Sequence, residues 1–66
     1  MRISDLQKVW VDADLAAAHA CVLCDNELEE AYVNLRRAAG RVLTALGQER
    51  TVARLRATSH RQEDSK

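Results

Sequence analysis

The chain has 66 residues, which allows at most one small domain, and its two cysteines are too few for a disulfide framework. No stretch reaches the roughly 18 to 20 apolar residues that span a membrane, and no targeting segment is visible, so we expect a cytoplasmic protein. The net charge of zero hides an asymmetry. Residues 1–35 carry two basic and seven acidic residues, a balance of −5, whereas residues 36–66 carry eight and three, a balance of +5.

The composition predicts a helical protein. Proline and phenylalanine are absent, there are only two glycines, and alanine, leucine, arginine and glutamate lose little on becoming helical. With one tryptophan and one tyrosine, a single copy can hardly fill a large core, so self-association is expected. The acidic and basic halves are expected to lie antiparallel and neutralise each other, within one chain or across a dimer. Alternatively, the basic half binds an acidic partner such as nucleic acid.

The first predicted helix runs over about residues 4–24. Ser4 and Gln7 have the spacing of a capping box, and apolar residues then recur every three or four positions. Trp10, one of the few aromatics, is expected to anchor the core, with an exposed contact point for a partner as the alternative. A second alternative is an extended N-terminal piece, with the helix capped later by Asp12 or Asp14.

The second predicted helix runs over residues 26–57, because Asn26 and Glu29 complete another capping box. No glycine or proline marks a turn before it. Leu28, Leu35 and Val42 repeat every seven residues, and alanines flank this line. We assign eight residues to the face that forms the core or the dimer contact: Trp10, Cys24, Leu28, Tyr32, Leu35, Ala39, Val42 and Leu46.

The predicted fold is therefore an all-α helical hairpin that dimerises into a helical bundle. Gly47 fits a helix C-terminus and is a candidate break, beyond which residues 48–57 would form a short third helix. Residues 1–58 form the single predicted domain, and residues 59–66 form a disordered polar tail. The alternatives are a three-helix arrangement and one long coiled-coil helix. The long coiled-coil helix is suggested by apolar residues that keep a 4-3 spacing across the expected bend: Ala17, Cys21, Cys24, Leu28, Ala31, Leu35, Ala38, Val42 and Ala45.

Cys21 and Cys24 are the strongest chemical feature, but they form one pair on the apolar side of a helical pattern. We interpret them as small core residues, because free cysteine buries readily. The alternatives are a metal site shared across a dimer and a redox pair. His19 is interpreted as a surface residue and His60 as part of the tail. The sequence contains no catalytic set and no phosphate-binding loop, so we expect neither catalysis nor a cofactor.

Four arginines are the candidates for contact with a partner or with nucleic acid: Arg37, Arg41, Arg50 and Arg54. Gln48, Arg50 and Arg54 after Gly47 faintly resemble the second half of a helix-turn-helix. The sequence as a whole predicts a small non-enzymatic protein that binds another protein as a regulator, adaptor or inhibitor, as a homodimer. The alternative is a dimeric regulator that binds DNA or RNA through its basic half.

Overall fold

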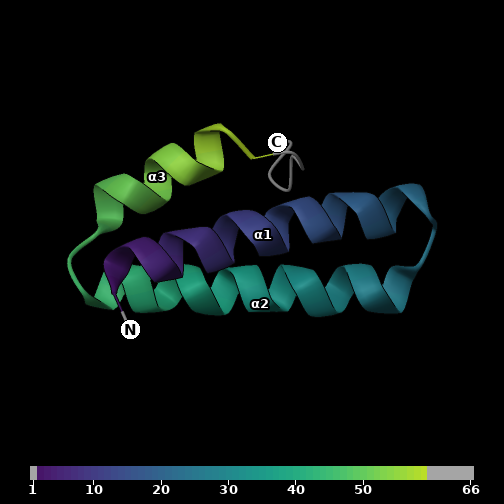
Figure 1. Ribbon diagram of the computed structural model, residues 1–66, viewed down its shortest axis with the longest axis horizontal. Coiled ribbons are helices and arrows are strands. Elements are labelled where there is room, and N and C mark those ends of the chain that lie inside the picture. The colour runs from purple at the N-terminus through teal and green to yellow at the C-terminus, as the bar shows by residue number, and fades with distance from the viewer. Residues whose placement is uncertain (1, 60–66) are drawn as a thin grey trace.

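The computed structural model describes residues 2–59, which form three helices: α1 (Ile3–Val22), α2 (Asn26–Ala45) and α3 (Glu49–Ala57). Helices α1 and α2 lie antiparallel as a hairpin (Figure 1). The predicted all-α hairpin is confirmed, and the break at Gly47 separates α3 from α2. The two alternatives of an extended N-terminal piece and one long helix are wrong, because α1 begins at Ile3 and the chain reverses after Val22.

Both helix starts differ slightly from the predicted caps. The Arg2 N–H donates to the Asp5 carboxylate at 3.3 Å, so α1 begins before Ser4. The Leu28 N–H donates to Asp25 Oδ1 at 3.1 Å, which makes Asp25 the cap of α2 instead of Asn26. An aspartate carries a negative charge that the positive end of the helix dipole favours, which accounts for the shift by one residue.

Helix α1 ends in a Schellman motif, the turn in which two N–H groups bond back to carbonyls of the last helical turn. The Cys24 N–H donates to the Cys21 carbonyl at 3.1 Å, and the Asp25 N–H donates to the Ala20 carbonyl at 3.0 Å. Cys24 has φ +60°, the left-handed conformation that glycine usually supplies. The chain therefore reverses sharply although no glycine or proline marks the turn.

Helix α2 ends in the same motif with glycine in the left-handed position. Gly47 has φ +82°, its N–H donates to the Thr44 carbonyl at 3.0 Å, and the Gln48 N–H donates to the Leu43 carbonyl at 2.9 Å. The predicted role of Gly47 as a helix end is thus confirmed. The two helix ends share the same hydrogen-bond pattern but place different residues, Cys24 and Gly47, in the left-handed position.

Replacing Cys24 by glycine is expected to raise the free energy of unfolding by about 1 kcal/mol. An L-residue costs roughly 1–2 kcal/mol in this conformation, and glycine loses part of that gain through its more flexible unfolded chain. Urea unfolding followed by circular dichroism would measure the change. Cys24→Ala is the matched control, because it removes the thiol but keeps Cβ, and its stability should stay near that of the parent. A gain as large for alanine as for glycine would contradict the backbone explanation.

The core lies where α1, α2 and α3 meet. Leu6, Leu43 and Val52 form a buried cluster, one residue from each helix, with Leu55 packed against it. Trp10 is only 4% exposed. The buried apolar residues of the described chain are Leu6, Trp10, Ala13, Ala17, Ala20, Val33, Ala39, Leu43 and Val52. Four of these nine are alanines, so the core is small.

Gly40 lies on the buried side of α2, although the exposed Arg37 and Arg41 are close to it in the sequence. A Cβ atom at this position would lie 3.6 Å from Trp10 Nε1 and 4.0 Å from Val52 Cγ1, which are ordinary van der Waals distances. A methyl group at this position would therefore fit between α2, Trp10 and α3.

Gly40→Ala is expected to stabilise the fold by about 0.5–1 kcal/mol, because a methyl group fits and alanine is the better helix former. Thermal and urea unfolding would measure the gain. Gly40→Leu is the contrasting variant: its longer side chain has to displace Trp10, so a loss of stability is expected. Destabilisation by alanine as well would mean that Trp10 lies closer to α2 than the structure places it.

Candidate interaction surface

Among the described residues, more large apolar side chains are exposed than buried. The buried ones are Leu6, Trp10, Val33, Leu43 and Val52. The exposed ones are Ile3, Leu15, Val22, Leu23, Leu28, Leu35, Val42 and Leu46. Scattered exposed leucines are common, but a protein of this size that exposes eight large apolar residues and buries five has surface available for binding.

Helix α2 carries four of these exposed residues on a single side. Leu28, Leu35, Val42 and Leu46 are between 42 and 52% exposed. Alanines at positions 31, 38 and 45 are also exposed and fall between them. We call six of these residues the α2 seam: Leu28, Ala31, Leu35, Ala38, Val42 and Ala45. Their 3-4-3-4-3 spacing is that of the a and d positions of a heptad repeat.

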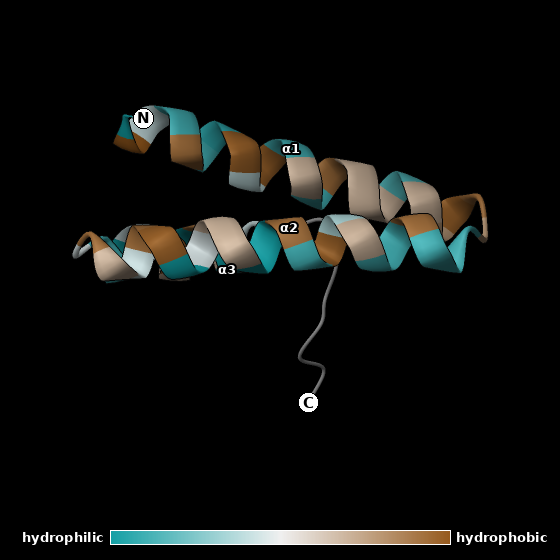
Figure 2. Cartoon of the chain, turned by 90° about the horizontal axis from the view of Figure 1, so that it is seen from below, coloured by the Kyte–Doolittle hydropathy of each residue, from teal (hydrophilic) through white to brown (hydrophobic). Residues whose placement is uncertain are grey.

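The α2 seam is not the face that meets α1. That face consists of Val33, Arg36, Ala39, Gly40 and Leu43, which lie adjacent to the seam around the helix. In Figure 2, apolar segments recur along the visible side of α2, while α3 lies behind it. Helix α2 thus has two apolar faces, and one of them has no neighbour within the described chain.

This placement separates the eight residues assigned to the core or dimer face. Trp10 and Ala39 are buried and Tyr32 is half-buried. The assignment to the core of a single chain is wrong for five residues, because α1 packs on the neighbouring face of α2 and their side chains remain exposed: Cys24, Leu28, Leu35, Val42 and Leu46. As dimer contacts they stay a prediction.

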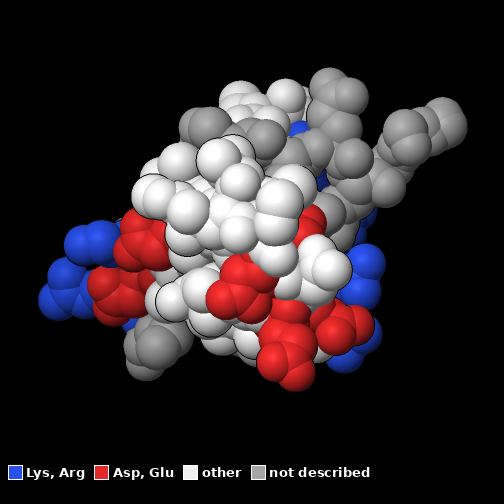
Figure 3. Space-filling model, turned by 90° about the vertical axis from the view of Figure 1, so that its right-hand side faces the viewer, with Lys and Arg blue, Asp and Glu red and all other residues white. Residues whose placement is uncertain are grey.

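The α1–α2 turn forms a second exposed apolar surface. Val22 is 80% and Leu23 64% exposed, and we call these two residues the hairpin tip. Acidic side chains gather around this end of the molecule, as Figure 3 shows, and Asp25, Glu27 and Glu30 are exposed there. The tip therefore combines apolar contact area with negative charge.

Cys21 and Cys24 lie beside the hairpin tip as exposed free thiols. The interpretation as small core residues is wrong, because both side chains are exposed at the end of the hairpin where the chain reverses. Within residues 2–59, no cluster of three or more His, Cys, Asp or Glu side chains could hold a metal ion. His19 is exposed as expected, and His60 lies outside the described residues.

The four candidate arginines Arg37, Arg41, Arg50 and Arg54 are all exposed, two on α2 and two on α3. Gln48 is half-buried at the start of α3, so it does not extend this exposed basic surface. The remaining arginine of α2, Arg36, has a different environment.

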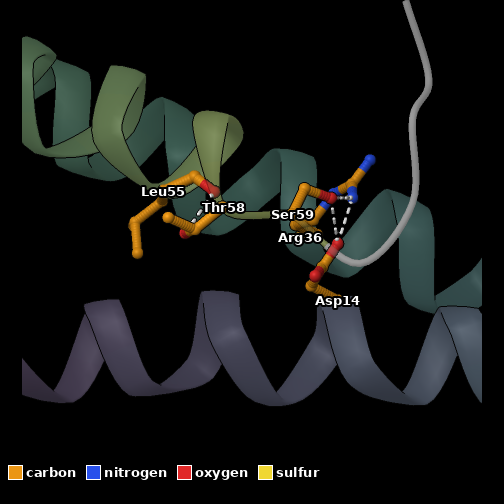
Figure 4. Close-up of polar contacts among 5 residues, drawn as sticks. All are labelled: Asp14, Arg36, Leu55, Thr58 and Ser59. Carbon is orange, nitrogen blue, oxygen red and sulfur yellow. Dashed lines mark hydrogen bonds and ion pairs between the residues drawn. The ribbon is translucent and has the colours of Figure 1, made fainter.

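Arg36 and Asp14 form a buried ion pair that links α2 to α1. Arg36 Nη1 donates to Asp14 Oδ1 at 2.5 Å, and the Ser59 hydroxyl donates to the same oxygen at 2.7 Å while it accepts from Arg36 Nη1 at 3.3 Å (Figure 4). The guanidinium carbon of Arg36 lies 5.3 Å from the centre of the Trp10 ring, in a cation–π contact. We call Asp14, Arg36 and Ser59 the polar node.

The polar node was not predicted from the sequence. Asp12 and Asp14 face different sides of α1, since Asp12 is exposed and Asp14 is 1% exposed. The sequence contains one indication that Asp14 is buried: it lies four residues after Trp10 and three before Ala17, at the spacing of the buried face of α1. Ser59, assigned to the tail, belongs to the packed fold; residues 60–66 of that predicted tail lie outside the described residues.

The comparisons with known proteins leave the function to be argued from the chain itself. No protein-family model, no curated protein and no solved structure matches this chain. Among residues 2–59, no helix has both the length and the apolar character needed to cross a membrane. The exposed apolar surfaces on α2 and at the hairpin tip are therefore the main observations that bear on function.

Proposed function

We propose that this chain is a small non-enzymatic protein that binds another protein as a regulator, adaptor or inhibitor, and that it does so as a homodimer in the cytoplasm. One observation carries the proposal: eight large apolar side chains are exposed and five are buried in the described chain. Exposed apolar side chains that gather together, as they do on α2 and at the hairpin tip, are typical of surfaces that bind proteins. Two free exposed thiols agree with a reducing compartment.

The hairpin tip is the proposed surface for the other protein. Val22 and Leu23 offer compact apolar contacts at the end of the molecule, where a partner can approach from several directions. The surrounding Asp25, Glu27 and Glu30 would steer the approach of a partner with basic residues around an apolar pocket. The expected partner surface is therefore apolar at its centre and positively charged at its rim.

The test is a comparison of proteins retained from a lysate of the native host. The parent chain is immobilised beside a Val22→Ser/Leu23→Ser variant and a Leu15→Ser control, which makes the same kind of change on an exposed apolar residue of α1. A partner that is retained by the parent and the control but lost from the tip variant supports the proposal. Equal retention by all three, or retention of nothing above the bare matrix, would refute it.

The alternative is a dimeric protein that binds DNA or RNA. It is supported by the exposure of Arg37, Arg41, Arg50 and Arg54 on adjoining helices. Binding through phosphates would give a retarded band with an arbitrary duplex at low salt, and the affinity would fall steeply as salt rises. An Arg50→Gln/Arg54→Gln variant would weaken that band. Absence of any band at low salt would exclude this alternative.

A further inference from the structure

The α2 seam is a complete heptad face without a neighbour in the described chain. We propose that a second copy of this chain covers it, with the two α2 helices packed antiparallel. This inference rests on the homodimer in the proposed function and adds the surface and the orientation. It predicts that the two hairpins meet through α2, so that α1 and α2 of both copies form one four-helix layer.

The alternation of large and small residues along the seam favours the antiparallel orientation. In antiparallel helix pairs, each a position faces a d position of the other helix. Leu28 then faces Ala45 of the second copy, Ala31 faces Val42, and Leu35 faces Ala38. Every layer thus combines a large side chain with an alanine, which fills space evenly. A parallel pair would instead place alanine against alanine in every second layer and leave gaps.

The charges beside the seam favour the same orientation. Glu27, Glu30, Arg37 and Arg41 follow one flank of α2 at spacings of three, seven and four, with the acidic residues near its start and the basic ones nearer its end. In an antiparallel pair, the acidic start of one helix lies beside the basic end of the other. In a parallel pair, this charged flank of each helix would lie beside the opposite, uncharged flank of its partner, so these acidic and basic residues would not pair.

The rest of the fold leaves the seam accessible. Helix α1 contacts the adjacent face of α2, and α3 lies behind α2 in the view onto its apolar side (Figure 2). An antiparallel pair also places the two hairpin tips at opposite ends of the dimer. The tips then remain available for another protein, and a metal site that shares Cys21 and Cys24 of both copies is incompatible with this arrangement.

The first experiment tests the surface by sedimentation equilibrium. The parent chain should have the mass of a dimer, and Leu35→Glu should raise the dimer dissociation constant at least about a hundredfold, because it buries an unpaired charge in the contact. Leu15→Glu is the matched control, with an equally exposed leucine on α1, and should stay dimeric. Circular dichroism should show the same helix content in all three. A monomeric parent, or a dimeric Leu35→Glu, would overturn the proposal.

The second experiment tests the orientation by disulfide formation in a Cys21→Ser/Cys24→Ser background, whose dimeric mass is checked first. A mixture of Leu28→Cys and Ala45→Cys chains should form the mixed disulfide. Leu28→Cys alone should not form one, since the two sulfurs would be about 25 Å apart along an antiparallel pair. A disulfide between two Leu28→Cys chains would overturn the orientation. A monomeric background would show that the thiols hold the dimer, and would overturn the proposed surface.

The two sets of results are separable. Loss of the dimer in Leu35→Glu, with retention of a host partner through the hairpin tip, would support the surface and the proposed function independently. A monomeric parent that still retains a partner through the tip would overturn this inference and leave protein binding intact. A dimer that retains no host partner would overturn protein binding and leave the proposed dimer surface intact.

Discussion

Replacing Arg36 by methionine is expected to lower the free energy of unfolding by about 3–5 kcal/mol. The change removes the counter-charge of the buried Asp14 carboxylate, and a buried charge that has lost its counter-charge is strongly destabilising. A domain this small has about that much stability in total, so the variant should be largely unfolded at room temperature. Urea unfolding followed by circular dichroism at a fixed protein concentration would measure the loss.

Two further variants separate the charge from the side chain. Arg54→Met makes the same change at an exposed arginine of α3 and should stay within about 0.5 kcal/mol of the parent. The double variant Asp14→Leu/Arg36→Met removes both charges and should recover most of the stability, because apolar replacements of buried ion pairs are often neutral or favourable. If Arg36→Met were as mild as Arg54→Met, the ion pair would not be buried in solution.

Trp10→Ala is expected to cost about 3–5 kcal/mol, the range for deleting a large buried aromatic side chain. Trp10 is the largest residue in a core that otherwise contains several alanines, so little nearby can move in to fill the space. The variant also loses the contact with the Arg36 guanidinium. Circular dichroism is the suitable measurement, because Trp10 is the only tryptophan and its fluorescence disappears with it.

Trp10→Phe keeps an aromatic ring and should lose clearly less stability than Trp10→Ala. Leu15→Ala, at an exposed position of the same helix, is the matched control and should change the stability by about 0.5 kcal/mol or less. Comparable losses for Trp10→Ala and Leu15→Ala would mean that the core is not built around Trp10.

The sequence was sufficient for the helices because their signals are local. Alanine and leucine content, acidic residues at the start of α2 and Gly47 at its end all act within a few residues, and each is found where expected to within one or two positions. The reversal at Cys24 was harder to predict. Its Schellman motif uses a left-handed cysteine, a conformation for which cysteine has no preference, so composition gave no indication of the turn.

The sequence did not predict which face of α2 meets α1, and the reason is physical. The line of Leu28, Leu35 and Val42 is the more apolar face, and sequence periodicity assigns such a face to the core. The actual core face contains Arg36 and Gly40, which periodicity assigns to the surface. Arg36 can be buried only because Asp14 neutralises it from another helix, and no local pattern within α2 reveals that partner.

The polar node has a consequence for how the chain unfolds. Asp14 lies in α1, Arg36 in α2, and Ser59 directly after α3, where the Thr58 hydroxyl bonds to the Leu55 carbonyl and closes the helix end (Figure 4). A nine-residue helix such as α3 is not stable by itself in water, so its order depends on the packing of Val52 and Leu55 and on this connection. The three helices should therefore open together, and the slowly exchanging amide hydrogens of α3 should exchange at the same free energy as those of α1 and α2.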